Sequence, residues 1–184
     1  MNFASWKNSK IFYIAFCLIA ASAICFSLFK PALKCFYPVK YVDEINMFSK
    51  KYGLREEFVM AIISAESKFQ KDAVSFKDAK GLMQLKEETA KWCIEKYEIE
   101  SDGKSLYLPS LNIETGCAYM HYLLEKFGDK SLALAAYNAG EGNVAKWLRD
   151  SKKSGKDFRI PFKETRNYVR TVEKREKIYR FLYY

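Results

Sequence analysis

Residues 56–69 read EEFVMAIISAESKF, a run without glycine or proline in which apolar residues recur at helical spacing. At about 100° per residue, Val59, Ile62 and Ile63 fall on one face of a helix, and Glu66 projects along the same face. A carboxylate on an apolar stripe is costly unless it gains partners or stays protonated. This stretch is therefore central to both the fold and the search for a function.

The spacing of Glu66 allows three interpretations. The helix ends in solvent near this residue, or Glu66 is a structural acid paired with an arginine. In the third, apolar surroundings raise the pKa of Glu66 toward ~6–7 and make it a general acid that protonates a leaving oxygen. The spacing alone leaves all three open.

The composition of the 184 residues favours a mostly helical protein. Apolar residues make up 49% and charged residues 29%, an ordinary globular balance. Only 8 glycines and 4 prolines are present, and no glycine precedes Gly53, which disfavours a turn-rich β-sandwich. The single histidine, His121, argues against a metal site, and no glycine-rich phosphate loop supports nucleotide chemistry.

Periodicity and glycine breaks predict a series of helices after residue 40. Their approximate ranges are 41–52, 56–69, 90–94, 112–127, 131–137, 143–148 and 164–182.

The N-terminus carries a different pattern. Residues 11–29 contain no charge and are bounded by Lys10 and Lys30, and as a helix these 19 residues span ~28 Å, close to the hydrocarbon core of a bilayer. We expect residues 1–30 to be an uncleaved membrane anchor, 31–41 a short linker and 42–184 the folded domain. The alternative is a signal cleaved after Ala23, within an A-x-A-like triplet that lies inside the apolar run.

The net charge of +9 falls to +6 without residues 1–30, which lose three lysines and no acid. No nucleic-acid-binding motif accompanies this excess, so we predict a solvated basic surface and no nucleic-acid partner. Cys93 and Cys117 lie in helical patterns, where small buried thiols are usual. A disulfide between them would require export and suitable geometry.

Motifs around Glu66 reveal a family resemblance. They are AESKF at 65–69, AVS at 73–75, GLMQ at 81–84, AYNAG at 136–140, GNV at 142–144 and PFKETRNYV at 161–169. In this order and spacing, the set resembles the catalytic domain of the soluble-lytic-transglycosylase family, the lysozyme-like enzymes that cut bacterial peptidoglycan. The resemblance implies a mainly α, lysozyme-like α+β fold with little β.

The resemblance also implies site residues. Glu66 matches the sole catalytic carboxylate. Matching substrate-binding positions are Ser75, Met83, Gln84, Tyr137, Asn138, Glu164 and Tyr168. Core packing is the alternative for Met83 and both tyrosines, and Glu164 also suits the first turn of a helix on electrostatic grounds alone. The family's glutamine is usually followed by an apolar Met-Pro pair, whereas Lys86-Glu87 follows Gln84-Leu85 here.

The implied activity is lytic cleavage between N-acetylmuramic acid and N-acetylglucosamine, without metal or organic cofactor. A hydrolase would need a second carboxylate, for which Asp72, Asp78 and Glu164 are candidates. A membrane-tethered glycan-binding protein without turnover is the other alternative. Because peptidoglycan lies outside the cytoplasmic membrane, the N-terminus is expected in the cytoplasm and the catalytic domain outside, and a partner in the cell-envelope machinery is left open.

Overall fold

The computed structural model describes residues 3–101, 103–154 and 158–184, without the side chains of residues 3–12, 15, 24–26 and 28 in the first helix. The chain divides into two compact units, Met1–Pro38 and Val39–Tyr184.

The first unit consists of helix α1 (Phe3–Phe36), which contains Pro31. The helix therefore continues past the expected start of the linker at residue 31, and the non-helical link begins after Phe36. Within the described part of the chain, none of the helices combines the length and the apolar character needed to cross a membrane. Several side chains of the expected anchor, residues 11–29, lie outside the described residues, so the anchor stays a prediction.

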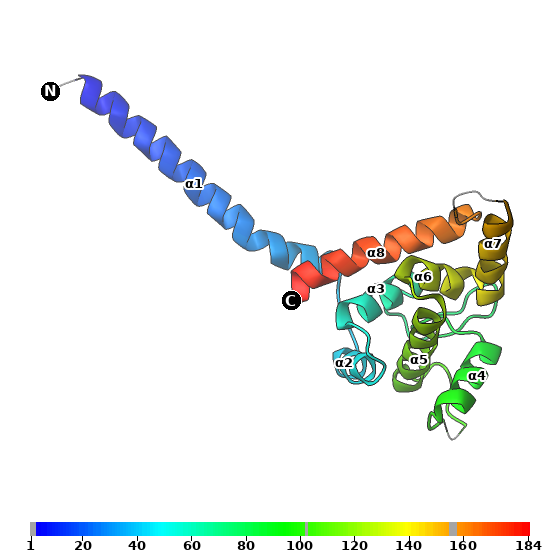
Figure 1. The fold of residues 1–184 in the computed structure, drawn as a ribbon. Coiled ribbons are helices and arrows are strands. Elements are labelled where there is room, and N and C mark those ends of the chain that lie inside the picture. The colour runs from blue at the N-terminus through cyan, green and yellow to red at the C-terminus, as the bar shows by residue number, and fades with distance from the viewer. Residues whose placement is uncertain (1–2, 102, 155–157) are drawn as a thin grey trace. The chain divides into compact units, whose positions relative to one another are not determined.

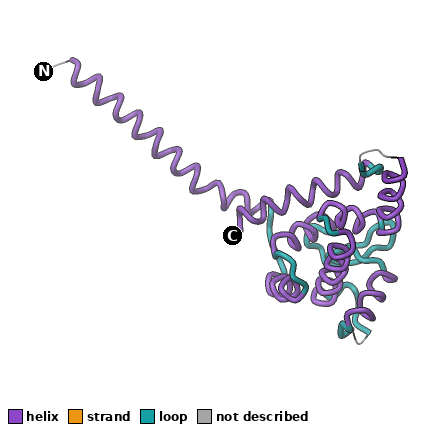
Figure 2. The backbone as a smooth tube through the Cα atoms, viewed as in Figure 1, coloured by secondary structure: helices purple, strands orange, loops and turns teal. Residues whose placement is uncertain are grey.

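The second unit is built from helices, as predicted (Figures 1 and 2). They are α2 (Val42–Lys51), α3 (Glu56–Glu66), α4 (Glu87–Tyr97), α5 (Pro109–Phe127), α6 (Lys130–Ala139), α7 (Glu141–Ser154) and α8 (Lys163–Tyr183). In the residues described, extended pairing is limited to isolated antiparallel bridges between Val74 and Lys80 and between Lys80 and Leu85. The mainly helical fold with little β is confirmed.

Helix α3 lies at the centre of this unit. Every side chain from Phe58 to Ile63 is at most 3% exposed. α8 runs along α3, and it also contacts α6, which packs against α5 and α7 (Figure 1). An α3 that is apolar on nearly every side is thus covered from several directions, as such a helix must be.

The end of α3 differs from the expected end at residue 69. The helix stops at Glu66, because Lys68 and Phe69 adopt left-handed backbone conformations with φ of 53° and 63°. Phe69 is nevertheless buried, at 3% exposure. This turn places the Glu66 side chain at the last position of α3.

A buried carboxylate joins α8 to the neighbouring elements. Glu176, 2% exposed, accepts hydrogen bonds from Arg55, from Lys130 Nζ at 2.8 Å and from Arg180 Nη2 at 3.4 Å. Arg180 Nε also donates to Glu57 Oε1 at 3.0 Å. The side chain of Glu176 is therefore neutralised by three cations from three parts of the chain.

Cys93 and Cys117 are free, and neither is exposed to solvent. Burial raises the pKa of the Cys93 thiol to about 12, and it raises that of Cys117 as well. The interpretation as small buried thiols is confirmed, and the structure contains no disulfide between them.

Candidate active site

Glu66 is half-buried and ends α3. Burial raises the pKa of its carboxyl from 4.5 to about 7, and the hydroxyl of Tyr168 opposes this shift by stabilising the anion. No cation contributes to the shift, and none of the ion pairs between described residues includes Glu66. The interpretation as a structural acid paired with an arginine is therefore wrong, and the carboxyl is part protonated near neutral pH.

A compact loop with several turns, residues 73–85, forms one wall beside Glu66. Gln84 holds it together, because its Nε2 donates to the carbonyl oxygens of Ala73 at 3.0 Å and Gly81 at 2.8 Å. The Ser75 hydroxyl accepts from the backbone N–H groups of Lys77 at 3.2 Å and Ala79 at 3.0 Å. Both predicted residues thus shape the backbone of the wall.

Asn112, a fully buried residue of α5, holds this loop in place by hydrogen bonds from the buried side. Its Oδ1 accepts from Met83 N at 2.7 Å, and its Nδ2 donates to Lys80 O at 3.0 Å and to Leu106 O at 2.8 Å. The approach leaves no room for a side chain at Gly81 (φ 77°), whose Cβ would lie 2.2 Å from Asn112 Nδ2. The sequence carries no signal for this role beyond an asparagine among apolar helix positions.

Two tyrosines complete the surroundings of the carboxyl. The Tyr137 hydroxyl donates to Met83 O at 2.7 Å, and its ring lies 5.4 Å from that of Tyr119. The Tyr168 hydroxyl is buried next to Glu66 but has no hydrogen-bond partner of ordinary geometry among the described residues. Burial first, and then the neighbouring carboxylate, raises the pKa of both phenols well above 10, so both stay neutral.

These elements enclose a groove of about 580 Å³. Six of the predicted site residues line it: Glu66, Ser75, Gln84, Tyr137, Asn138 and Glu164. Tyr168 is not part of this lining, although its half-buried side chain interacts with Glu66. Met83 does not line the groove either, because its side chain is fully buried against Gly116, where a Cβ would lie 2.3 Å from Met83 Sδ.

Several other residues that line the groove were not predicted as site residues from the sequence. Phe76, 93% exposed, follows Ser75, and Tyr119 faces the groove from α5. Others are Lys77, Glu88, Thr89, Asn143, Phe162 and Thr165. Lys86, where the sequence departs from the family pattern, also lines the groove and so lies where it would meet a ligand.

The acids near Glu66 bear on the mechanism. Glu88 and Glu164 line the groove, whereas Asp72 and Asp78 do not. Asp78 instead approaches Lys80 Nζ at 3.8 Å. Of the three second carboxylates considered from the sequence, the structure brings only Glu164 to the groove.

Comparison with known proteins adds an independent result. A family model described as the transglycosylase SLT domain matches residues 43–160. The soluble lytic murein transglycosylase of Escherichia coli K12 is 33% identical over 152 residues, which cover 79% of this chain and 24% of that protein. A membrane-bound lytic murein transglycosylase C of Shigella sonnei is 32% identical, over 77% of this chain and 46% of the relative.

Solved structures agree with these matches. An inactive mutant of the lytic transglycosylase Slt from Pseudomonas aeruginosa superimposes with a TM-score of 0.71 at 36% identity, over 80% of this chain and 25% of that one. The chain thus spans about a quarter of the length of the soluble relatives it matches.

Proposed function

The chain belongs to the transglycosylase SLT domain family, and from this premise we propose that it is a peptidoglycan lytic transglycosylase. Its substrate is the glycan strand of alternating N-acetylmuramic acid and N-acetylglucosamine. The observation that carries the proposal is the raised pKa of Glu66, about 7, in a groove where no cation neutralises the carboxylate.

Glu66 performs two proton transfers in the proposed reaction. The protonated carboxyl donates its proton to the glycosidic oxygen while positive charge develops at the anomeric carbon of the muramic acid. The resulting carboxylate then removes the proton from the 6-hydroxyl of the same sugar. That oxygen attacks the anomeric carbon, closes a 1,6-anhydro ring and leaves Glu66 protonated for the next turnover.

The other residues of the site bind and position the glycan. Ser75, Gln84, Asn138 and Glu164 present polar groups to the groove, and Tyr137 presents a planar ring with a fixed hydroxyl. The Tyr168 hydroxyl lowers the pKa of the Glu66 carboxyl. We assign Met83 no direct contact with the sugar, because its contribution to the site is the backbone carbonyl that orients Tyr137.

The mass of the released muropeptides tests the proposal. Purified sacculi digested with the protein should release 1,6-anhydro products, which are one water lighter than the products of hydrolysis. Reducing-end muramic acid as the main product would instead establish a hydrolase, with Glu164 or Glu88 as the second carboxylate. Binding to sacculi without product release would establish a glycan-binding protein.

The proposal extends to location. Residues 11–29 anchor the chain in the cytoplasmic membrane, with the N-terminus inside and the catalytic domain, from Val42 onward, outside. The support is the uncharged run between Lys10 and Lys30, together with a substrate that lies outside the membrane. Protease added to protoplasts should remove the domain and leave an embedded N-terminal stub. Protection of the whole chain would reverse the topology, and an exported product beginning after Ala23 would establish cleavage.

A further inference from the structure

The outward face of α8 carries a row of cations. All of its members are exposed, and they are Lys163, Arg170, Lys174 and Lys177. At about 100° per residue they fall within about 60° of one another, along about 21 Å of helix. Buried residues of α8 lie on the opposite face, among them Thr165, Val172 and Glu176. We call the four exposed residues the cationic row.

The cationic row has no acidic partner among the described residues. None of its four members, and not Glu173 at its edge, forms an ion pair with a described residue. Arg170 and Lys174 are one turn apart, a spacing at which like charges destabilise a helix. On α4, by contrast, Lys91 Nζ approaches Glu95 Oε1 at 3.9 Å, as is usual on a solvated helix face. An uncompensated row therefore points to an anionic surface outside the chain.

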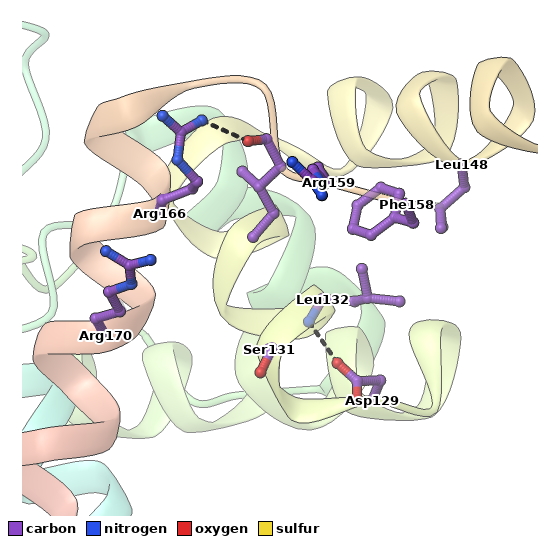
Figure 3. A pocket seen from close by; sticks show the side chains of 9 residues that line it. Asp129, Ser131, Leu132, Leu148, Phe158, Arg159, Arg166 and Arg170 are labelled. Carbon is purple, nitrogen blue, oxygen red and sulfur yellow. Dashed lines mark hydrogen bonds between the residues drawn. The ribbon is translucent and has the colours of Figure 1, made fainter. Parts of the chain in front are cut away.

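The cationic surface widens at the start of α8. A cavity of about 1010 Å³ lies there, with three arginines against one aspartate in its lining: Arg159, Arg166, Arg170 and Asp129. Arg166 and Arg170 stand one turn apart on α8, and Arg159 lies on the chain that leads to the helix (Figure 3). Arg166 uses only Nη1, which donates to two backbone carbonyls, and so leaves Nε and Nη2 available. Because guanidinium groups match the oxygens of a phosphate, this end of the row suits phosphate-bearing groups.

Aromatic side chains lie at the other end of α8. Phe181, 48% exposed, continues the line of the cationic row, and Tyr184, 65% exposed, follows three residues later. Aromatic residues are enriched where proteins meet the headgroup region of a membrane. Clusters of lysine and arginine near a membrane anchor are typical of proteins that bind anionic lipids. The combination favours a lipid surface as the partner of this face.

The short connection between the two units also favours a lipid surface. Helix α1 ends at Phe36 and α2 begins at Val42, so the chain between them spans at most about 22 Å. With residues 11–29 in the membrane, this link keeps the domain at a high effective concentration beside the lipid headgroups. Weak individual attractions are then sufficient for docking.

We propose that the cationic row of α8 binds the anionic phospholipid headgroups of the membrane that holds the anchor. Thr165, which lines the groove of Glu66, lies on the opposite face of α8, so docking leaves the groove on the side away from the membrane. This inference rests on the proposed function and its location. It adds a fixed orientation of the catalytic domain against the membrane.

The native lysines are suitable probes of this docking. The full chain is reconstituted in vesicles of phosphatidylcholine alone and in vesicles of equal parts phosphatidylcholine and phosphatidylglycerol. A membrane-impermeant acetylating reagent is added, and mass spectrometry measures the labelling rate of each lysine. Lys163, Lys174 and Lys177 report on the row, and the exposed Lys91 and Lys104, on α4 and in the loop after it, are the internal reference.

In the anionic vesicles, the labelling rates of the row lysines relative to the reference lysines should fall about three- to tenfold, because the lipid attracts and covers these cations. Salt at about 1 M, where the Debye length is about 3 Å, should abolish the protection. Equal relative rates in both kinds of vesicle would overturn the proposal. That result includes equal protection of Lys91 and Lys104, which a general attraction of the basic chain to the lipid would produce.

A double variant tests the row itself. K174Q/K177Q should lose most of the protection at Lys163, whereas K50Q/K71Q, which removes the same charge at exposed positions outside the row, should keep it. Full protection of Lys163 in K174Q/K177Q would contradict the proposal, because other residues would then make the contact. Protection by poly(glycerol phosphate) in neutral detergent, without protection in anionic vesicles, would assign the row to a wall polymer instead.

Release of anhydro-muropeptides by the same preparations separates this inference from the proposed function. A chain that shows lipid-dependent protection but yields no anhydro product would refute the proposed activity and leave the docking standing. A chain that releases anhydro product without lipid-dependent protection would refute the docking alone.

Discussion

Glu66 and Glu176 are the same residue type in two regions of one unit, with opposite surroundings. Glu176 of α8 is 2% exposed and accepts hydrogen bonds from Arg55, Lys130 and Arg180. Glu66 of α3 has no cation beside it, and burial moves its pKa to about 7. Three cations balance the charge of Glu176, whereas partial protonation near neutral pH reduces the charge of Glu66.

The difference separates the acid to which we assign proton transfer from the acid that joins parts of the fold. Glu176 accepts hydrogen bonds from three cations on different elements, so its side chain joins these parts of the fold. An acid that is buried without a cation destabilises the protein when it ionises, and it is ready for proton transfer near neutral pH. Burial alone does not separate the two roles, but the presence or absence of neighbouring cations does.

The largest expected effect is on turnover. Glu66→Gln should lower kcat on sacculi by about 10²- to 10⁴-fold, because the amide neither donates nor accepts the required proton. Glu176→Gln should retain kcat at temperatures where it is folded. Release of anhydro-muropeptides measures both, with circular dichroism to confirm the fold. An active Glu66→Gln variant would end the distinction between the two acids.

The next effect is on stability. Glu176→Gln should lower the free energy of unfolding by about 2–4 kcal/mol, because three cations lose their shared partner. The side chains of Arg55 and Arg180 are half-exposed, at 55% and 48%, which limits the loss. Urea denaturation measures it. Glu95→Gln, whose partner is the exposed Lys91, is the control and should change stability by less than about 0.5 kcal/mol.

The next effect is on the pH dependence of stability, which ionisation of Glu66 should control. The folded-state pKa of Glu66 is raised above the unfolded value, so the wild type loses stability as pH rises from about 4.5 through about 7. Glu66→Gln should match the wild type near pH 4 and exceed it by about 1–3 kcal/mol at pH 8. Thermal unfolding at both pH values checks this, and a destabilised variant at pH 8 would show that the native carboxylate is well solvated.

The smallest effect concerns Tyr168. Its hydroxyl lowers the pKa of Glu66, so Tyr168→Phe should raise that pKa. The alkaline limb of the plot of kcat against pH should then move to higher pH, by less than about one unit. Tyr137→Phe, which removes the bond to Met83 O, should lower activity without moving the limb. An unmoved limb in Tyr168→Phe would remove Tyr168 from the control of Glu66.

Local pattern was sufficient to predict the helices and to single out Glu66, because an acid on an apolar stripe is visible within one turn of helix. Its role as a proton donor came from the family resemblance and stays a prediction. The end of α3 was not predictable in this way, since the left-handed conformations of Lys68 and Phe69 accompany the burial of Phe69 in the tertiary core. α7 similarly extends to Ser154, well beyond the apolar positions that indicated it.

Contacts between distant segments account for what the sequence did not show. Asn112 holds a turn about 30 residues earlier in the chain, and nothing in its neighbourhood along the sequence indicates that partner. Met83 illustrates the reverse case. A motif placed it beside the substrate, but the absent side chain of Gly116 leaves a space that Met83 fills from within the core.

The two buried glycines behind the groove have different prospects for inherited change. A Cβ at Gly116 would meet the flexible side chain of Met83, so alanine there could follow an exchange of Met83 for a shorter residue. A Cβ at Gly81 would also lie 2.5 Å from Leu106 O, a backbone atom that no exchange of side chains removes, and the positive φ at this position disfavours any residue that has a Cβ. In proteins descended from this one, substitutions at positions 83 and 116 should therefore occur together, whereas glycine should be retained at position 81.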